Sequence, residues 1–169
     1  MAEAFLQDRL HSAGVDATVH SSGLLYTGRP ATDHGVSVLG ELGLDISGHR
    51  STLVSVELLE GADLVLGMAR EHIREAVVLV PDAWPRAFTL KELVRRGEEL
   101  GARTPGQPLD EWLDKCHAGR THADLLGTSL DDDVPDPIGM HRTAYQRTAS
   151  MLYDLVDRLV AVAFPEGTP

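Results

Sequence analysis

The hydrophobic and polar positions of this chain follow two periods, one typical of helices and one typical of strands. Apolar residues recur at helical spacing and predict helices over residues 1–13, 36–43, 71–80, 91–100 and 144–164, with shorter helical pieces over 55–59, 109–118 and 121–126. Alternation over 16–21 predicts a strand, and 86–90 predicts a second. The continuous apolar run over 63–68 is typical of a central parallel strand buried on both faces. Because the strands feed helices, the order predicts an α/β fold with a small parallel sheet flanked by helices.

Size and composition narrow the class of protein. The 169 residues, 43% of them hydrophobic and 24% charged, suit a single domain over 1–169. A formal charge of −11 disfavours nucleic acid as a partner, because nucleic acid is held largely by Lys and Arg. The chain has no apolar run of the roughly 20 residues that span a bilayer. It also begins without a signal-peptide pattern, so we expect no membrane partner and a cytoplasmic location.

The single cysteine, Cys116, excludes an internal disulfide and a cysteine metal cluster. It is followed by Arg120, which superficially resembles a cysteine loop that wraps a phosphate. Such a loop needs a longer spacing between cysteine and arginine and a buried strand before it, whereas a helical segment precedes Cys116 here. A cysteine at a helix end is therefore the favoured interpretation.

The histidines predict neither a metal nor a cofactor. His117 and His122 are the closest pair, but their spacing does not place both on one helix face. His49 and Arg50 follow one another in a predicted loop and could bind an anion, although a surface or packing role is the default. No nucleotide-binding glycine pattern is present.

The acidic stretch that ends in Asp136-Pro137 is the sharpest local signal for chemistry. Prolines on both sides of Asp136 limit its backbone and help to present its carboxyl group in one direction. The neighbouring carboxylates at 131–133 are expected to disfavour ionisation of Asp136, and a protonated carboxyl could donate its proton to a leaving group. On spacing alone, an acidic turn between two helices is the default interpretation.

The order of these segments resembles the low-molecular-weight protein tyrosine phosphatase family over nearly the whole chain. The resemblance rests on the first helix and on five later segments: Ser21-Ser22-Gly23, Gly28-Arg29-Pro30, Gly43 to Ser51, Ala62 to Met68, and Asp136-Pro137. It implies hydrolysis of a phosphomonoester, on a phosphorylated protein or a small molecule, through a phosphocysteine intermediate. By this resemblance Asp136 is the general acid. Ile138-Gly139 replaces the aromatic pair that follows the aspartate-proline in many members, which weakens the case for phosphotyrosine.

The family's first strand and its cysteine–arginine phosphate loop would lie immediately before Met1. From this we expect an N-terminally incomplete phosphatase domain whose first, central strand is absent. The nucleophile and the other substrate-binding residues are then unknown, and the chain alone is predicted to be inactive. One alternative is a non-catalytic relative that binds a partner, or a second copy of itself, through the open strand slot. An arsenate reductase is a weaker alternative, because such enzymes need further cysteines.

Overall fold

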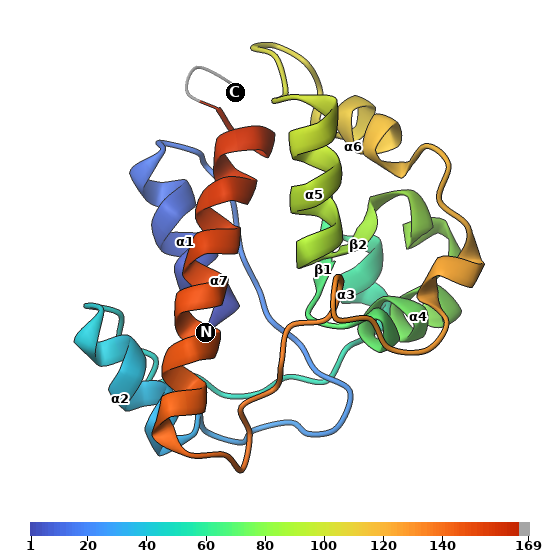
Figure 1. Ribbon diagram of the computed structural model, residues 1–169. Helices are drawn as coiled ribbons and strands as arrows, with labels where there is room; N and C mark the ends of the chain where they lie inside the picture. Colours follow the sequence, from blue (N-terminus) through green and yellow to red (C-terminus); the bar gives the residue numbers. More distant parts are fainter. Residues whose placement is uncertain (166–169) are drawn as a thin grey trace. The chain divides into compact units, whose positions relative to one another are not determined.

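The computed structural model describes residues 1–165, and the chain divides into two compact units (Figure 1). Unit 1 comprises Met1–Leu53 and Pro135–Asp157, and unit 2 comprises Val54–Val134 and the segment from Arg158 onward. Each unit is described by itself below, and the single domain over 1–169 stays a prediction.

The elements follow the predicted order closely. The helices are α1 (Ala2–Ser12), α2 (Asp33–Glu41), α3 (Val56–Glu60), α4 (Arg70–Leu79), α5 (Leu90–Leu100), α6 (Leu109–His117) and α7 (Arg142–Ala163). Two 3₁₀ helices, η1 (Pro81–Arg86) and η2 (His122–Leu125), and two strands, β1 (Val65–Gly67) and β2 (Ala87–Thr89), complete the set. The predicted helices are thus confirmed, while the strands are fewer and shorter than expected.

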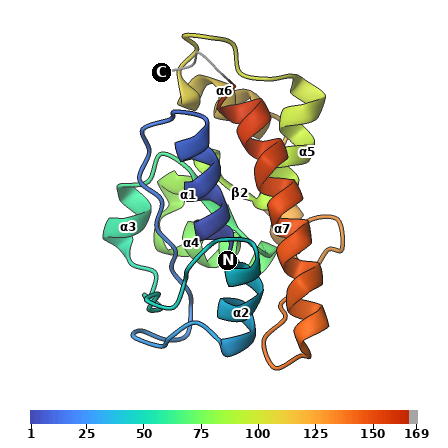
Figure 2. The ribbon, with the colours of Figure 1, turned by 90° about the vertical axis from the view of Figure 1, so that its left-hand side faces the viewer.

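Unit 1 is built from α1, α2 and the part of α7 up to Asp157. Figures 1 and 2 show α1 lying along α7. Between these helices, Phe5 is buried and its ring lies edge-on to that of Tyr153, with a centroid distance of 5.7 Å. Arg9 of α1 also forms an ion pair with Asp157 of α7. The N-terminus of α2 is capped by Thr32, whose hydroxyl accepts a hydrogen bond from the backbone N–H of Gly35 at 3.2 Å.

The predicted strand over 16–21 is wrong, because this segment forms no strand. All of its residues except Val19 are exposed. Alternation makes a segment compatible with a sheet, but a strand exists only where a neighbouring strand takes its backbone hydrogen bonds. In residues 1–165 the strands are β1 and β2, so this segment lies outside the sheet.

The sheet lies in unit 2 and consists of β1 and β2 in parallel, with Val65 opposite Ala87 and Gly67 opposite Thr89. This confirms the α/β class with a small parallel sheet. The expectation of a strand buried on both faces is wrong for β1, since Val65 and Leu66 are only partly buried. The other strand differs, because Ala87, Phe88 and Thr89 of β2 are all buried. The absence of a further family strand, and the pairing of a partner or a second copy with the sheet, stay predictions.

Helix α4 packs directly on β1, and this close approach requires a glycine. A Cβ added to Gly67 would lie 2.7 Å from Cδ1 of Ile73, well inside contact distance. Ile73, Val77, Trp84, Ala87 and Leu125 form one buried cluster of this unit. The core of unit 2 therefore joins α4, η1, β2 and η2.

Candidate active site

Asp136 occupies a tight turn in unit 1, just before α7. Its Oδ1 accepts a hydrogen bond from the backbone N–H of Ile138 at 3.0 Å, which orients the carboxyl group within its own turn. Two further bonds fix the turn: the hydroxyl of Thr148 donates to the carbonyl of Pro135 at 3.2 Å, and the N–H of Met140 donates to the carbonyl of Pro137 at 3.0 Å. Asp136 itself is exposed to solvent. A solvent-facing carboxylate on a braced turn is suited to exchanging protons with a bound molecule.

Two other segments that carry the family resemblance pair with each other in unit 1. The N–H of Gly23 donates to the carbonyl of Thr52 at 2.8 Å, and the N–H of Gly28 donates to the carbonyl of Ser51 at 2.7 Å. The N–H of Ser51 in turn donates to the carbonyl of Arg29 at 2.9 Å. The loop over 22–30 is thus fastened along residues 51–52, although these segments lie far apart in sequence.

His49 and Arg50, considered above for anion binding, are engaged within the protein. Nδ1 of His49 lies 3.3 Å from Oε2 of Glu3 on α1, and the same oxygen accepts a hydrogen bond from Ser21 at 2.7 Å. Arg50 donates to the backbone carbonyls of Ser47 and His49. These contacts favour the structural role for both side chains.

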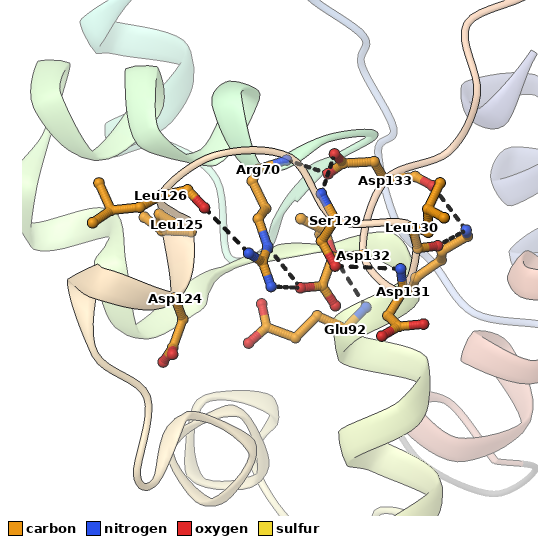
Figure 3. A network of polar contacts seen from close by, with 12 residues as sticks. Arg70, Glu92, Asp124, Leu125, Leu126, Ser129, Leu130, Asp131, Asp132 and Asp133 are labelled. Atoms are coloured by element: carbon orange, nitrogen blue, oxygen red, sulfur yellow. Dashed lines mark hydrogen bonds and ion pairs between the residues drawn. The ribbon is translucent and has the colours of Figure 1, made fainter.

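The acidic residues before Asp136 belong to unit 2, where Asp132 is paired with arginine side chains (Figure 3). Asp132 is buried and accepts hydrogen bonds from Arg70 at 2.6 and 2.8 Å and from Arg95 at 3.0 Å. Burial acts to raise the pKa of Asp132, but the hydrogen bonds from Arg70 and Arg95 outweigh it and hold that pKa below its ordinary value.

Asp133 and Lys91 complete this network. One carboxylate oxygen of Asp133 accepts from the N–H of Arg70 at the start of α4, and the other accepts from the N–H of Ser129, both at 2.8 Å. The Lys91 ammonium donates to the carbonyls of Leu130 and Asp133 at 2.9 and 2.8 Å. Asp133 is thus held by backbone N–H groups and Lys91 by backbone carbonyls, and the expectation that the carboxylates at 131–133 disfavour ionisation of Asp136 stays a prediction.

Sequence reasoning did not anticipate this network. Asp132 lies 62 residues from Arg70 and 37 from Arg95, so no local spacing links them. The acidic run itself was visible in the sequence, but its partners were not.

Cys116 lies in the last turn of α6 and is buried, which confirms the interpretation as a cysteine at a helix end. Burial raises the pKa of its thiol to about 11, although Arg96 and Arg120 act in the opposite direction. A nucleophile must be a thiolate near neutral pH, and Cys116 is protonated there.

The chain belongs to the low molecular weight phosphotyrosine protein phosphatase family, whose sequence model matches residues 1–111. The general acid assigned by resemblance, Asp136, lies beyond that match, so its role stays a prediction.

Among individual relatives, the chain is 34% identical over 95 residues to a protein-arginine-phosphatase of Bacillus subtilis (strain 168), a match that covers 56% of this chain and 63% of that protein. It is 34% identical over 93 residues to a probable low molecular weight protein-tyrosine-phosphatase, EpsP, of Ralstonia solanacearum, covering 55% of this chain and 62% of that protein. The matches thus span slightly less than two thirds of these two relatives.

Solved structures agree with this assignment. A low molecular weight protein tyrosine phosphatase from T. tengcongensis superposes with a TM-score of 0.69 at 32% identity, over 94% of this chain and 86% of that one. Within residues 1–165, no helix is both long and apolar enough to cross a membrane.

Proposed function

We propose that this chain supplies the scaffold and the general acid of an enzyme that hydrolyses phosphomonoesters or related phosphoryl groups on proteins. Family membership supports the reaction class, and the turn that presents Asp136 supports the role of that residue. In this role the carboxylic acid protonates the leaving group as the phosphoryl group is transferred, and the resulting carboxylate then assists an attacking water. We expect the protein to act in the cytoplasm.

The substrate is proposed as a phosphorylated protein side chain, and phosphoarginine is a candidate beside phosphotyrosine. Two relatives are protein-arginine-phosphatases, including one from Geobacillus stearothermophilus that is 28% identical over 160 residues. Ile138, which is 70% exposed, follows Asp136-Pro137 in the place of the aromatic pair that the family resemblance leads us to expect there. Comparing hydrolysis of a phosphoarginine peptide with that of a phosphotyrosine peptide by an active form of the protein tests this choice.

The nucleophile of this reaction is not Cys116. Its thiol is buried, has a pKa of about 11, and is the only thiol in the 169 residues. We therefore expect negligible hydrolysis of p-nitrophenyl phosphate by the 169-residue chain. Robust hydrolysis that Cys116→Ser abolishes would overturn both this expectation and the placement of the site.

The family resemblance implies a cysteine–arginine phosphate loop as the source of the nucleophile, and Cys116 is the only cysteine of the 169 residues, so such a loop would have to lie outside them. Translating the reading frame around these 169 codons tests the idea directly, and a frame without such a loop contradicts it. If the loop is present, the longer polypeptide should hydrolyse aryl phosphates.

In that longer polypeptide, Asp136→Asn should lower kcat by about 10²–10⁴-fold, the usual contribution of a general acid, without changing the fold. Asp131→Asn is the matched control, because Asp131 is an exposed aspartate of the same acidic stretch. Equal losses in the two variants would contradict the role of Asp136.

A further inference from the structure

Arg120 is the centre of a buried polar cluster in unit 2. Its side chain is fully buried, and its guanidinium lies between the rings of Trp84 and Phe88, 3.9 and 4.0 Å from their centroids. Both carboxylate oxygens of Glu92 accept hydrogen bonds from it, at 2.8 and 3.0 Å, and the carbonyls of Trp84 and Ala87 accept at 3.2 and 2.8 Å. The position of this cation is therefore fixed by contacts on both faces and along its edge.

His117 completes the cluster, and the chemistry of its partner defines its protonation state. Nδ1 of His117 lies 3.0 Å from Nη1 of Arg120. Because a guanidinium only donates hydrogen bonds, Nδ1 must accept, and the ring is then a neutral imidazole with its proton on Nε2. The same ring meets Trp84 edge-on, with a centroid distance of 5.1 Å. The cluster as built thus requires an unprotonated His117.

The charges around His117 act in opposite directions. The charged groups that act on it are Arg120, the α5 residues Arg96 and Glu92, and Asp114 on its own helix, α6. A second histidine, His122 of η2, lies against the same Trp84 ring. Burial is the largest influence and Arg120 the next, and both lower the pKa of His117, whereas Asp114 and Glu92 raise it. The net result is a pKa below the ordinary value of a histidine.

This cluster holds one end of the segment over 118–126, and two further arginines hold the other end. The ring of His122 stacks on Trp84 at 4.9 Å, and Leu125 is buried in the core of unit 2. The carbonyls of Leu125 and Leu126 accept hydrogen bonds from Arg74 and Arg70, both at 3.2 Å, the latter drawn in Figure 3. Arg70 also binds Asp132, so a movement of this segment would change the contacts of an arginine that the acidic network shares.

We propose that His117 is an acid-sensitive latch, by which we mean that its neutral imidazole, through its hydrogen bond from Arg120, keeps the segment over 118–126 packed against Trp84. When the imidazole takes up a proton, Nδ1 no longer accepts from Arg120, and two cations then face each other inside the cluster. This repulsion weakens the attachment of the segment at the Arg120 end, although Glu92 still binds Arg120, so the segment opens from Trp84 more often while unit 1 keeps its structure.

Hydrogen exchange of the full chain between about pH 7.5 and about pH 5 tests the latch. Protection factors, corrected for the intrinsic exchange rate at each pH, are measured for amides over 118–126, with α1 as the internal reference. The opening equilibrium constant of the segment should rise by up to about tenfold for each pH unit below about 6.5, until His117 is also protonated in the closed form. The amides of α1 should show no such rise.

Two variants identify the group responsible. His117→Asn keeps an acceptor oxygen near the position of Nδ1 but cannot take up a proton, so its opening should not depend on pH. His122→Asn is the matched control, because His122 also stacks on Trp84 but accepts no hydrogen bond from Arg120; it should keep the full pH dependence. A pH step that survives in His117→Asn or disappears in His122→Asn overturns the proposal.

An NMR titration of the histidine side chains in the unmodified chain provides a test that needs no variant. His117 should titrate below about 6.5, and a value at or above it overturns the latch.

Discussion

Asp132 and Asp136 lie four residues apart in the sequence, yet their surroundings are opposite. Asp132 is buried and bound by two arginines, whereas Asp136 is exposed and its carboxylate accepts a hydrogen bond from its own turn. Removing one partner of a buried ion pair is strongly destabilising, so Asp132 has a structural role. An aspartate that is held by its own turn and faces solvent remains available for proton transfer. The contrast separates a structural residue from a candidate catalytic one within a single acidic stretch.

The largest effect is expected from Asp132→Ala, which leaves Arg70 and Arg95 without their partner. Removing one member of a buried, hydrogen-bonded ion pair should lower the free energy of unfolding by about 2–3 kcal/mol, somewhat below the loss for a fully buried pair because Arg95 is 44% exposed. Urea unfolding at neutral pH measures this difference. Asp136→Ala is the comparison variant, and a similar loss in both would erase the distinction between the two residues.

The two arginines should contribute unequally. Arg70 is 23% exposed and also donates to the carbonyl of Leu126, so Arg70→Gln should cost about 1–2 kcal/mol of unfolding free energy. Arg95 is 44% exposed, so Arg95→Gln should cost about 0.5–1 kcal/mol, as for other exposed ion pairs. Denaturant titrations of both variants test the order, and a larger loss for Arg95→Gln would show that its greater exposure does not weaken its pairing.

Acid should reduce the difference between the chain and its Asp132→Asn variant. The pKa of Asp132 is lower in the folded protein than its ordinary value of about 3.9. Its charge therefore stabilises the fold above that ordinary value, and this contribution is lost as the pH falls through the folded value. Stability measured from about pH 6 to about pH 2 should show the two proteins converging at the acid end, and a constant difference would contradict this account.

The smallest effect is expected from Asp136→Asn. Asn keeps an acceptor oxygen for the N–H of Ile138, so the turn is preserved and the free energy of unfolding should change by less than about 0.5 kcal/mol. Thermal unfolding measures this difference. A large loss would indicate a structural role for Asp136 and would weaken its assignment as the general acid.

The helices could be predicted because their signals are local. The helical piece predicted over 55–59 is α3, and the hydroxyl of Ser55 caps its start by accepting a hydrogen bond from the N–H of Leu58. The helix predicted over 144–164 from its apolar spacing is α7, and its apolar residues Leu152, Leu155 and Leu159 are buried. Periodicity and caps involve residues within a few positions of one another, so the sequence carries them directly.

The strands were predicted less well because a strand depends on its neighbour. The alternating segment over 16–21 has the composition of a strand but forms none, while β1 and β2 pair across 22 residues of sequence, as Val65 with Ala87. A period of two residues reveals which side chains share a face, but not whether another segment supplies the hydrogen bonds.

The candidate site was predicted only in part, for the same reason. The family resemblance singled out Asp136, whose role stays a prediction, and the spacing after Cys116 was sufficient to set that residue aside as a nucleophile. Two features were not predictable, because the partners lie on other elements. These are the pairing of Asp132 with arginines and the contacts of His117 and His122 with Trp84.

The amino-acid sequence by itself determined the helices of this protein, its α/β class, its resemblance to a phosphatase family and the aspartate proposed as its acid. These follow from short-range periodicity, turn chemistry and the order of segments along the chain. Tertiary structure alone decided that Asp132 is paired with two arginines and that Cys116 is buried and protonated. It also decided that a neutral histidine accepts a hydrogen bond from a buried arginine. Charge and burial are properties of the whole surroundings of a side chain, and those surroundings exist only once distant segments have packed together.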